Sequence, residues 1–236
     1  MNGFVDLIIE PILWFITSGI FYTLGLYFLN KLIKSSRESK LFFSGLTIFF
    51  LGWGTARLIE TIRRYYVGNY YDIIECVISG NFTISGLNLI LRLAYIIISW
   101  SAVVYFYFVT ETIFLNKKSL YIFSIATIVQ EILSVLIYFN IDVLILLIIF
   151  FLIVAVVPII MFAALGIKKF SGQRGVWFIL SLGLLFFVLG VAGDNPEPYM
   201  ITQYINIYVI HYGTPIFVII GMILIAIGVV SIYRGL

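Results

Sequence analysis

The sequence has little charge: Asp, Glu, Lys and Arg make up 11% of its 236 residues, whereas a soluble domain has about 25%. With 63% hydrophobic residues, a water-soluble protein of this length could not cover its surface with polar groups. Lipid must therefore replace water over most of the exterior. The 22 Phe and 16 Tyr residues exclude a disordered chain, because such chains are poor in aromatics. We expect an integral membrane protein.

Cysteine and histidine are each present once. A single cysteine, Cys76, excludes an intramolecular disulfide and a multi-cysteine metal site. The only histidine is His211, so a His-based zinc or haem site would lack ligands. The sequence contains no Gly-rich phosphate loop, no paired-Asp metal motif and no basic patch for nucleic acid. We therefore expect no cofactor, no metal and no nucleic-acid partner.

Seven apolar runs are long enough to cross the bilayer, which takes about 20 helical residues. The first run is expected to stay as a membrane helix, because the N-terminus has neither the basic start nor the small-residue cleavage site of a signal peptide. The fold class is thus all-α, a polytopic bundle of seven transmembrane helices in one domain over 1–236. The expected spans are 5–30, 41–62, 87–115, 119–139, 142–167, 176–193 and 214–233.

The basic residues predict the orientation of the chain. Threading seven helices in order places ten of the fourteen Lys and Arg residues in loops on one side, which the positive-inside rule assigns to the cytoplasm. The N-terminus is then outside and the C-terminus cytoplasmic. The outer side is expected to hold Arg63 and Arg64, together with two longer segments at 65–86 and 194–213 that cover the helix ends. The ten cytoplasmic residues are Lys31, Lys34, Arg37, Lys40, Lys117, Lys118, Lys168, Lys169, Arg174 and Arg234.

Three successive spans each carry polar residues at spacings of three and four, which place them on one helix face. Such stripes are expected to turn inward, because lipid cannot satisfy them. The stripes are Trp53, Arg57, Glu60 and Arg64; Asn88, Arg92, Tyr95 and Ser99; and Ser124, Thr127, Glu131, Ser134 and Tyr138.

Ionisable residues inside a membrane are costly and are functional candidates by default. The four candidates, Arg57, Glu60, Arg92 and Glu131, all fall in the outer half by depth, with Glu131 deepest at about 12 Å. Arg57 and Glu60 are expected to pair within their helix, and Arg92 and Glu131 across two antiparallel helices. One interpretation is a charge-neutral set that fixes which helix lies beside which. The other is a polar pocket, open to the outside, that binds a ligand or moves a proton.

Small residues mark faces where helices can approach closely. Gly52 and Ala56 are four residues apart in the second span, and Gly221 and Gly228 lie two turns apart in the seventh. Such pairs are common in membrane helices and are weak indicators of a dimer.

Seven helices with an outside N-terminus resemble the topology of microbial rhodopsins and G-protein-coupled receptors. The similarity is one of architecture, because the span 214–233 has no Lys for a retinal Schiff base. The acidic-Arg-Tyr and Asn-Pro-x-x-Tyr signatures of the receptors are absent too. No retinal is expected.

A thiol enzyme is a further alternative. Cys76 and His211 are both predicted outside, and nucleophilic catalysis needs a thiolate beside a base. The run around Cys76 is only vaguely similar to the cysteine motif of the exosortases, and a lone Cys in a membrane protein is more often a small apolar filler. We expect no enzymatic activity.

The preferred interpretation is a non-enzymatic module of the plasma membrane, either receptor- or sensor-like or a subunit of a larger assembly. The short cytoplasmic loops leave little room for independent signalling, so a protein partner or a homo-oligomer is expected besides the lipid bilayer. The alternative is a transporter of a small solute, ion or proton that uses Arg92 and Glu131. The inner halves of most spans are almost purely apolar, which favours a site that opens outward only.

Overall fold

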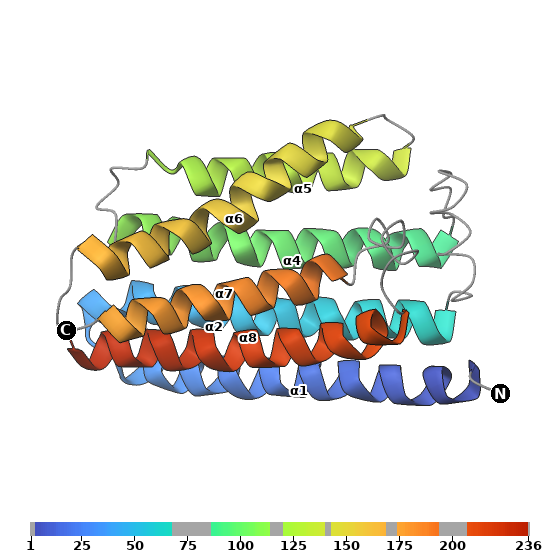
Figure 1. The fold of residues 1–236 in the computed structure, drawn as a ribbon, viewed down its shortest axis with the longest axis horizontal. Coiled ribbons are helices and arrows are strands. Elements are labelled where there is room, and N and C mark those ends of the chain that lie inside the picture. The colour runs from blue at the N-terminus through green and yellow to red at the C-terminus, as the bar shows by residue number, and fades with distance from the viewer. Residues whose placement is uncertain are drawn as a thin grey trace. The chain divides into compact units, whose positions relative to one another are not determined.

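The computed structural model describes residues 3–67, 86–113, 120–139, 143–168, 174–193 and 207–235, and within these ranges the secondary structure is helical apart from short stretches at 35–36, 120–121 and 143, with no strand. Figure 1 shows the arrangement. The elements in chain order are α1 (Gly3–Lys34), α2 (Arg37–Ile62), the π-helical turn η1 (Arg63–Val67), α4 (Gly86–Ile113), α5 (Ile122–Leu136), the 3-10 turn η2 (Ile137–Phe139), α6 (Leu144–Lys168), α7 (Arg174–Gly193) and α8 (Ile207–Gly235).

Six helical stretches in the described residues are long and apolar enough to cross a membrane. They are Ile9–Lys34, Ser39–Val67, Gly86–Ile113, Ile122–Phe139, Ile145–Ala164 and Tyr212–Ser231. Each lies on one of the predicted spans. The remaining prediction, 176–193, falls on α7, whose apolar part Gly175–Val191 is shorter. The prediction of a multi-span helical membrane protein is thus supported, while a count of seven stays a prediction.

Several helix ends differ from the predicted spans, among them the start of α8 and the end of α1. α8 begins at Ile207, although 207–213 was assigned to an external covering segment. The helix therefore includes part of the stretch that alternates polar groups with Ile and Tyr, and Pro215 lies inside it. α1 continues to Lys34, with Lys31 and Lys34 in its last turn. Basic side chains interact favourably with the carbonyl end of a helix, so these two residues extend α1 rather than end it.

The chain divides into two compact units, 1–151 and 152–236, with the boundary inside α6. That the whole chain forms a single domain therefore stays a prediction. In the first unit, α1 packs against α2, α2 against α4, and α4 against α5, so the four helices form a row (Figure 1).

Aromatic side chains fill the interior between α1 and α2. Phe21 and Phe28 of α1 and Phe50 of α2 are fully buried, and the rings of Phe28 and Phe50 stack with centroids 5.4 Å apart. α2 and α4 approach closely at Gly52, where an added Cβ would lie 2.7 Å from Ala102 Cβ. The predicted close-approach face of the second span is therefore a contact within the chain.

In the second unit α7 and α8 pack along their glycines. A Cβ added at Gly183 would lie 2.8 Å from the backbone nitrogen of Ile225, and one at Gly190 would lie 2.8 Å from the backbone oxygen of Thr214. Gly221 faces the backbone of Phe187 in the same way. Glycine lets helix backbones approach and gain van der Waals contact, which drives helix association in lipid.

Contacts between the remaining part of α6 and α7 include a hydrogen bond and a ring pair. Ser181 Oγ donates to the backbone oxygen of Ile159 at 2.9 Å. The rings of Phe162 and Trp177 stack with centroids 5.9 Å apart.

Candidate functional site

The candidate site is built on the last turns of α2, where one carboxylate accepts hydrogen bonds from three arginines. Arg63 binds Glu60 in a bidentate fork, with Nε 2.8 Å from Oε2 and Nη2 2.7 Å from Oε1. Arg64 Nε donates to Oε1 at 3.2 Å. Spacings of three and four place both arginines beside Glu60, and the turn η1 keeps them buried, with 2% and 8% of their surface exposed.

The third arginine comes from α4. Arg92 Nη1 donates to Glu60 Oε1 at 2.8 Å, and its Nε donates to the hydroxyl of Tyr138 at 2.7 Å. Arg63 Nη1 reaches α4 in the opposite direction and donates to Asn88 Oδ1 at 2.8 Å. Glu60 and its donors therefore connect α2, α4 and η2 through charge-assisted hydrogen bonds, which are shorter and stronger than neutral ones.

Arg57 lies one turn before Glu60, among aromatic rings. Its guanidinium carbon is 4.6 Å from the ring centre of Trp14, 5.3 Å from that of Trp53 and 5.4 Å from that of Tyr95. The residue is 1% exposed. Cation–π attraction is largest when the cation is desolvated, so the three rings offset part of the cost of burial. Arg92 also lies over Tyr95, at 5.1 Å, which places the two guanidiniums against one ring.

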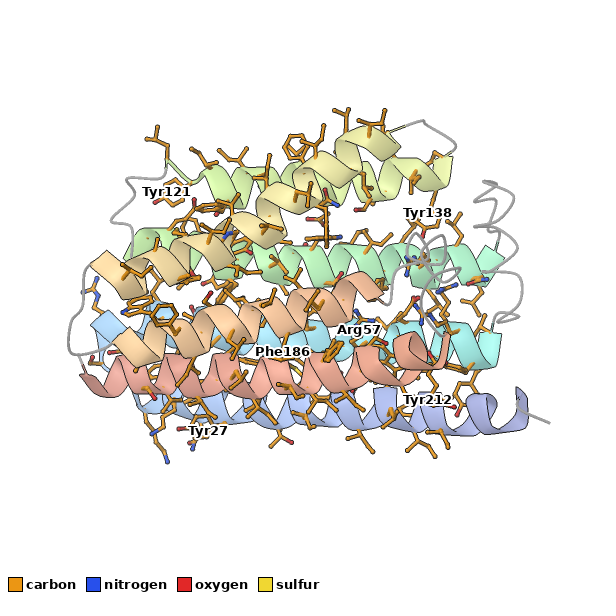
Figure 2. The ribbon with its side chains drawn as sticks, in the orientation of Figure 1. Tyr27, Arg57, Tyr121, Tyr138, Phe186 and Tyr212 are labelled. Atoms are coloured by element: carbon orange, nitrogen blue, oxygen red, sulfur yellow. The ribbon has the colours of Figure 1, made fainter. Side chains whose placement is uncertain are left out.

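We call these four arginines, Arg57, Arg63, Arg64 and Arg92, the guanidinium cluster. Its four cations are buried with Glu60, and Glu10 is also buried, one turn before Trp14 on α1. Figure 2 shows Arg57, and it shows Tyr138 at the opposite end of α5 from Tyr121. Two buried carboxylates thus accompany four buried guanidiniums in the described part of this region.

One of the two predicted ion pairs is wrong. Arg92 and Glu131 do not meet, since Arg92 donates to Glu60 and Tyr138 while Glu131 accepts from Ser101 Oγ at 3.2 Å. The Glu60 carboxylate accepts from Arg63, Arg64 and Arg92, and its pairing with Arg57 stays a prediction.

The reason for this error is the register of α4 against α5. Arg92 lies at the level of Tyr138, and Ser101 lies at the level of Glu131. Seven residues separate Glu131 from Tyr138, which is about 10 Å along the helix.

The inward turn of the three polar stripes is confirmed for most of their members. Trp53, Arg57, Glu60 and Arg64 are buried on α2 and η1, Arg92, Tyr95 and Ser99 on α4, and Ser124 and Thr127 on α5. Glu131 is the exception among the four candidates, because its side chain is only partly buried.

The contacts of Arg63 and Arg64 with Glu60 were not predicted, because both arginines were assigned to the outer face. The signal was present in their spacing of three and four from Glu60. Arg64 was placed in the stripe, but a span drawn to end at 62 left Arg63 out of it, although the helical path continues through η1.

The role of Glu111, which caps another helix, was not predicted from the sequence either. Glu111 is 1% exposed. Its carboxylate accepts from the backbone nitrogens of Phe123 and Ser124, at 3.0 and 3.1 Å, and from the Ser124 hydroxyl. These are donors of the first turn of α5, whose N-cap residue Tyr121 has a φ of 58° and offers no side-chain cap. A carboxylate is favoured at a helix N-terminus, where backbone N–H groups lack partners.

The predicted thiol pair is not described by the structure. Cys76 lies outside the described residues, and His211 lies in the first turns of α8 with its side chain outside them. Over the described residues, no group of three or more His, Cys, Asp or Glu side chains is placed to hold a metal ion.

Comparisons with known protein families, curated proteins and solved structures find no match to this chain.

Proposed function

We propose that the protein is a non-enzymatic, receptor-like module of the plasma membrane that recognises an anionic group at its guanidinium cluster. In this proposal the chain spans the bilayer seven times, with the N-terminus outside and the C-terminus in the cytoplasm. The observation that carries it is the shared carboxylate of Glu60, which three buried arginines contact at once.

The charge balance of the cluster supports an anionic ligand. The described region holds four guanidiniums and the two carboxylates of Glu10 and Glu60. Buried charge in a membrane is costly and marks functional sites by default. Guanidinium groups bind carboxylate and phosphate through parallel N–H donors. An anion that draws Arg64 or Arg92 from Glu60 would therefore replace one favourable contact by another.

The position of the cluster gives such binding a structural consequence. Glu60 belongs to α2 and Arg92 to α4, and their 2.8 Å contact joins the two helices. A ligand that changes this contact favours a different arrangement of α2 against α4, because it binds the two arrangements unequally. The short cytoplasmic loops would pass the change to a protein partner rather than to a domain of the chain.

The burial of Arg63 and Arg64 supports the orientation. They were the only basic residues assigned to the outer face, and both are buried with Glu60. The exposed basic residues of the described chain include Lys31, Lys34 and Arg37, at the junction of α1 and α2. Removing the two buried arginines from the count sharpens the asymmetry on which the positive-inside rule depends.

A transporter that uses Arg92 and Glu131 together fits the geometry less well. The two side chains bind different partners at different levels of α5. We therefore place the recognition site at the guanidinium cluster alone.

The experiment measures thermal unfolding of the protein in phosphatidylcholine nanodiscs, in sodium phosphate and in sodium chloride at equal ionic strength. We expect phosphate to raise the Tm with saturation, as a ligand that binds the folded state does. Arg64→Gln should weaken the effect at least tenfold in half-saturating concentration. Lys34→Gln, which removes the same charge at the far end of α1, should leave it unchanged. Repeating the titration with phosphatidylglycerol distinguishes a lipid headgroup, which would raise the Tm without added phosphate.

Two outcomes would contradict the proposal. One is equal behaviour of phosphate and chloride in both lipids. The other is an effect that appears only after Asp72→Asn and Glu75→Gln, because the chain's own acidic residues, which lie outside the described ranges, would then supply the missing charge.

A further inference from the structure

A groove between α4 and α5 lies apart from the guanidinium cluster. It has a volume of about 530 Å³, within the usual range of small-molecule sites, about 300–1,000 Å³. Ser101 and Glu131 line one end, and Phe108 and Tyr121 line the other. The rings of Phe108 and Tyr121 stack with centroids 5.3 Å apart. Glu131 and Tyr121 are ten residues apart, which makes the groove about 15 Å long.

The wall between these ends is apolar. Ile125 and Ile128 line the groove on α5 and are 55% and 44% exposed. Isoleucine side chains are commonly exposed to lipid, but these two lie on the same wall as the carboxylate of Glu131. The groove therefore combines a long apolar wall with a single acidic group.

Glu131 is the unusual member of this surface. It is the tenth of the eighteen residues in its membrane-crossing stretch, so it lies close to the middle of the span. In the described chain its one hydrogen-bond donor is Ser101 Oγ, at 3.2 Å, and no cation lies within ion-pair distance of it. An acidic side chain at this depth is costly without a partner, and a hydroxyl donor does not neutralise its charge.

A second copy of the chain does not supply a cationic partner for Glu131 either. The arginines inside the described spans, away from their cytoplasmic ends, are those of the guanidinium cluster, and all four are buried. A homo-oligomer would therefore bring only apolar or neutral side chains to Glu131 at this depth.

We propose that the groove binds a hydrophobic amine, with its ammonium at Glu131 and Ser101 and its alkyl chain along Ile125 and Ile128. The carboxylate supplies the charge that an ammonium needs in a medium of low dielectric constant. The isoleucines and the Phe108–Tyr121 pair supply the apolar surface that an alkyl chain buries. This site is independent of the proposed anion recognition, because it shares no residue with the guanidinium cluster.

The test measures how fast a hydrophobic carbodiimide modifies Glu131 in nanodiscs, by peptide mass analysis, with decylamine or decanol present. This reagent activates carboxylic acids in apolar surroundings, and the activated group then rearranges to an acylurea or is captured by an amine as an amide, with release of the urea. The rate is therefore taken from the loss of the unmodified Glu131 peptide, which counts both products. We expect decylamine to slow the modification at least tenfold at a concentration where decanol, with the same chain length and no charge, slows it less than twofold. Glu131→Gln should remove the modified peptide while leaving the Tm within the error of the wild type.

A pair of variants tests the path of the alkyl chain. Ile128→Trp fills the groove and should reduce the protection by decylamine at least fivefold, relative to the same variant without amine. Ile132→Trp changes a residue that is 53% exposed on α5 outside the groove lining, and should leave protection intact.

Three results would overturn the proposal. Equal protection by decylamine and decanol would mean that the groove takes up apolar chains without regard to charge. An absence of protection would mean that no amine binds. Failure of the reagent to reach Glu131 in the folded wild type would mean that the groove is covered by another part of the protein.

Discussion

The two units of the chain hold their helices together with different chemistry. In the first unit, α2 and α4 are joined by Glu60 and its arginines, and Arg57 lies among three aromatic rings. In the second unit, α7 and α8 meet along Gly183, Gly190 and Gly221. The first kind of contact depends on charge and on the donors around it, and the second on the absence of side chains. The first unit, which also has a close helix approach at Gly52, should therefore be the more sensitive to loss of charge, and the second unit to added side-chain bulk.

The largest effect is expected from Glu60→Gln in the first unit. The change leaves Arg63, Arg64 and Arg92 buried without their shared carboxylate, and breaking a buried ion pair in this way costs about 3–5 kcal/mol. Chemical unfolding of the purified protein in mixed micelles checks it. Lys34→Gln, which removes an exposed charge, is the control. A loss below that of the control would mean that the cluster does not stabilise the unit.

The next largest effect is expected from Gly221→Ala in the second unit. The added Cβ would lie 2.8 Å from Phe187 Cα, and overpacking of this kind costs about 1–3 kcal/mol. Gly213→Ala, in the same helix, is the matched control, because its Cβ would meet nothing closer than 4.0 Å. That variant should be neutral or stabilising, since Ala has the higher helix propensity. Equal effects of the two substitutions would argue against close packing of α7 on α8.

A smaller effect is expected from Glu111→Gln. The amide keeps one acceptor but loses the charge at the N-terminus of α5, and loss of a helix cap costs about 0.5–2 kcal/mol. Hydrogen exchange of the Phe123 and Ser124 amides should rise together with the fall in stability. In Thr112→Val, which removes a hydroxyl bonded to Phe108 of the same helix, those amides should exchange at the wild-type rate.

The smallest effect is expected from Ser181→Ala. The lost bond to the Ile159 oxygen joins α6 to α7, and hydrogen bonds between membrane helices average about 0.6 kcal/mol. Ser99→Ala is the comparison, because Ser99 Oγ donates to Ile96 of its own helix. A loss for Ser181→Ala as large as that for Gly221→Ala would mean that polar contacts matter as much as glycines in the second unit.

The sequence was sufficient for the features that follow from periodicity. The spacing of Arg57, Glu60 and Arg64 predicted one buried face, and the structure buries all three. Long apolar runs predicted the membrane-crossing helices to within a few residues at most ends. These patterns depend on residues that are close together in the chain, so they can be recognised in the sequence alone.

Partner choice was not predictable from the same patterns. Arg92 binds Glu60 and Tyr138 rather than Glu131 because of the register between α4 and α5, and register depends on packing across two helices. The cap formed by Glu111 was missed for the same reason, since its partners are twelve and thirteen residues away on another helix. The glycines of α8 predicted a close approach but not that α7 makes it.

The most direct test of the charged network is a pair of double-mutant cycles on Arg92, read by unfolding free energy. Arg92→Gln is combined with Glu60→Gln in one cycle and with Glu131→Gln in the other. If Arg92 is the partner of Glu60, the first cycle gives a coupling of at least about 1 kcal/mol, while the second pair adds to within about 0.5 kcal/mol. Coupling to Glu131 with additivity at Glu60 would contradict the network and would restore a direct Arg92–Glu131 pair.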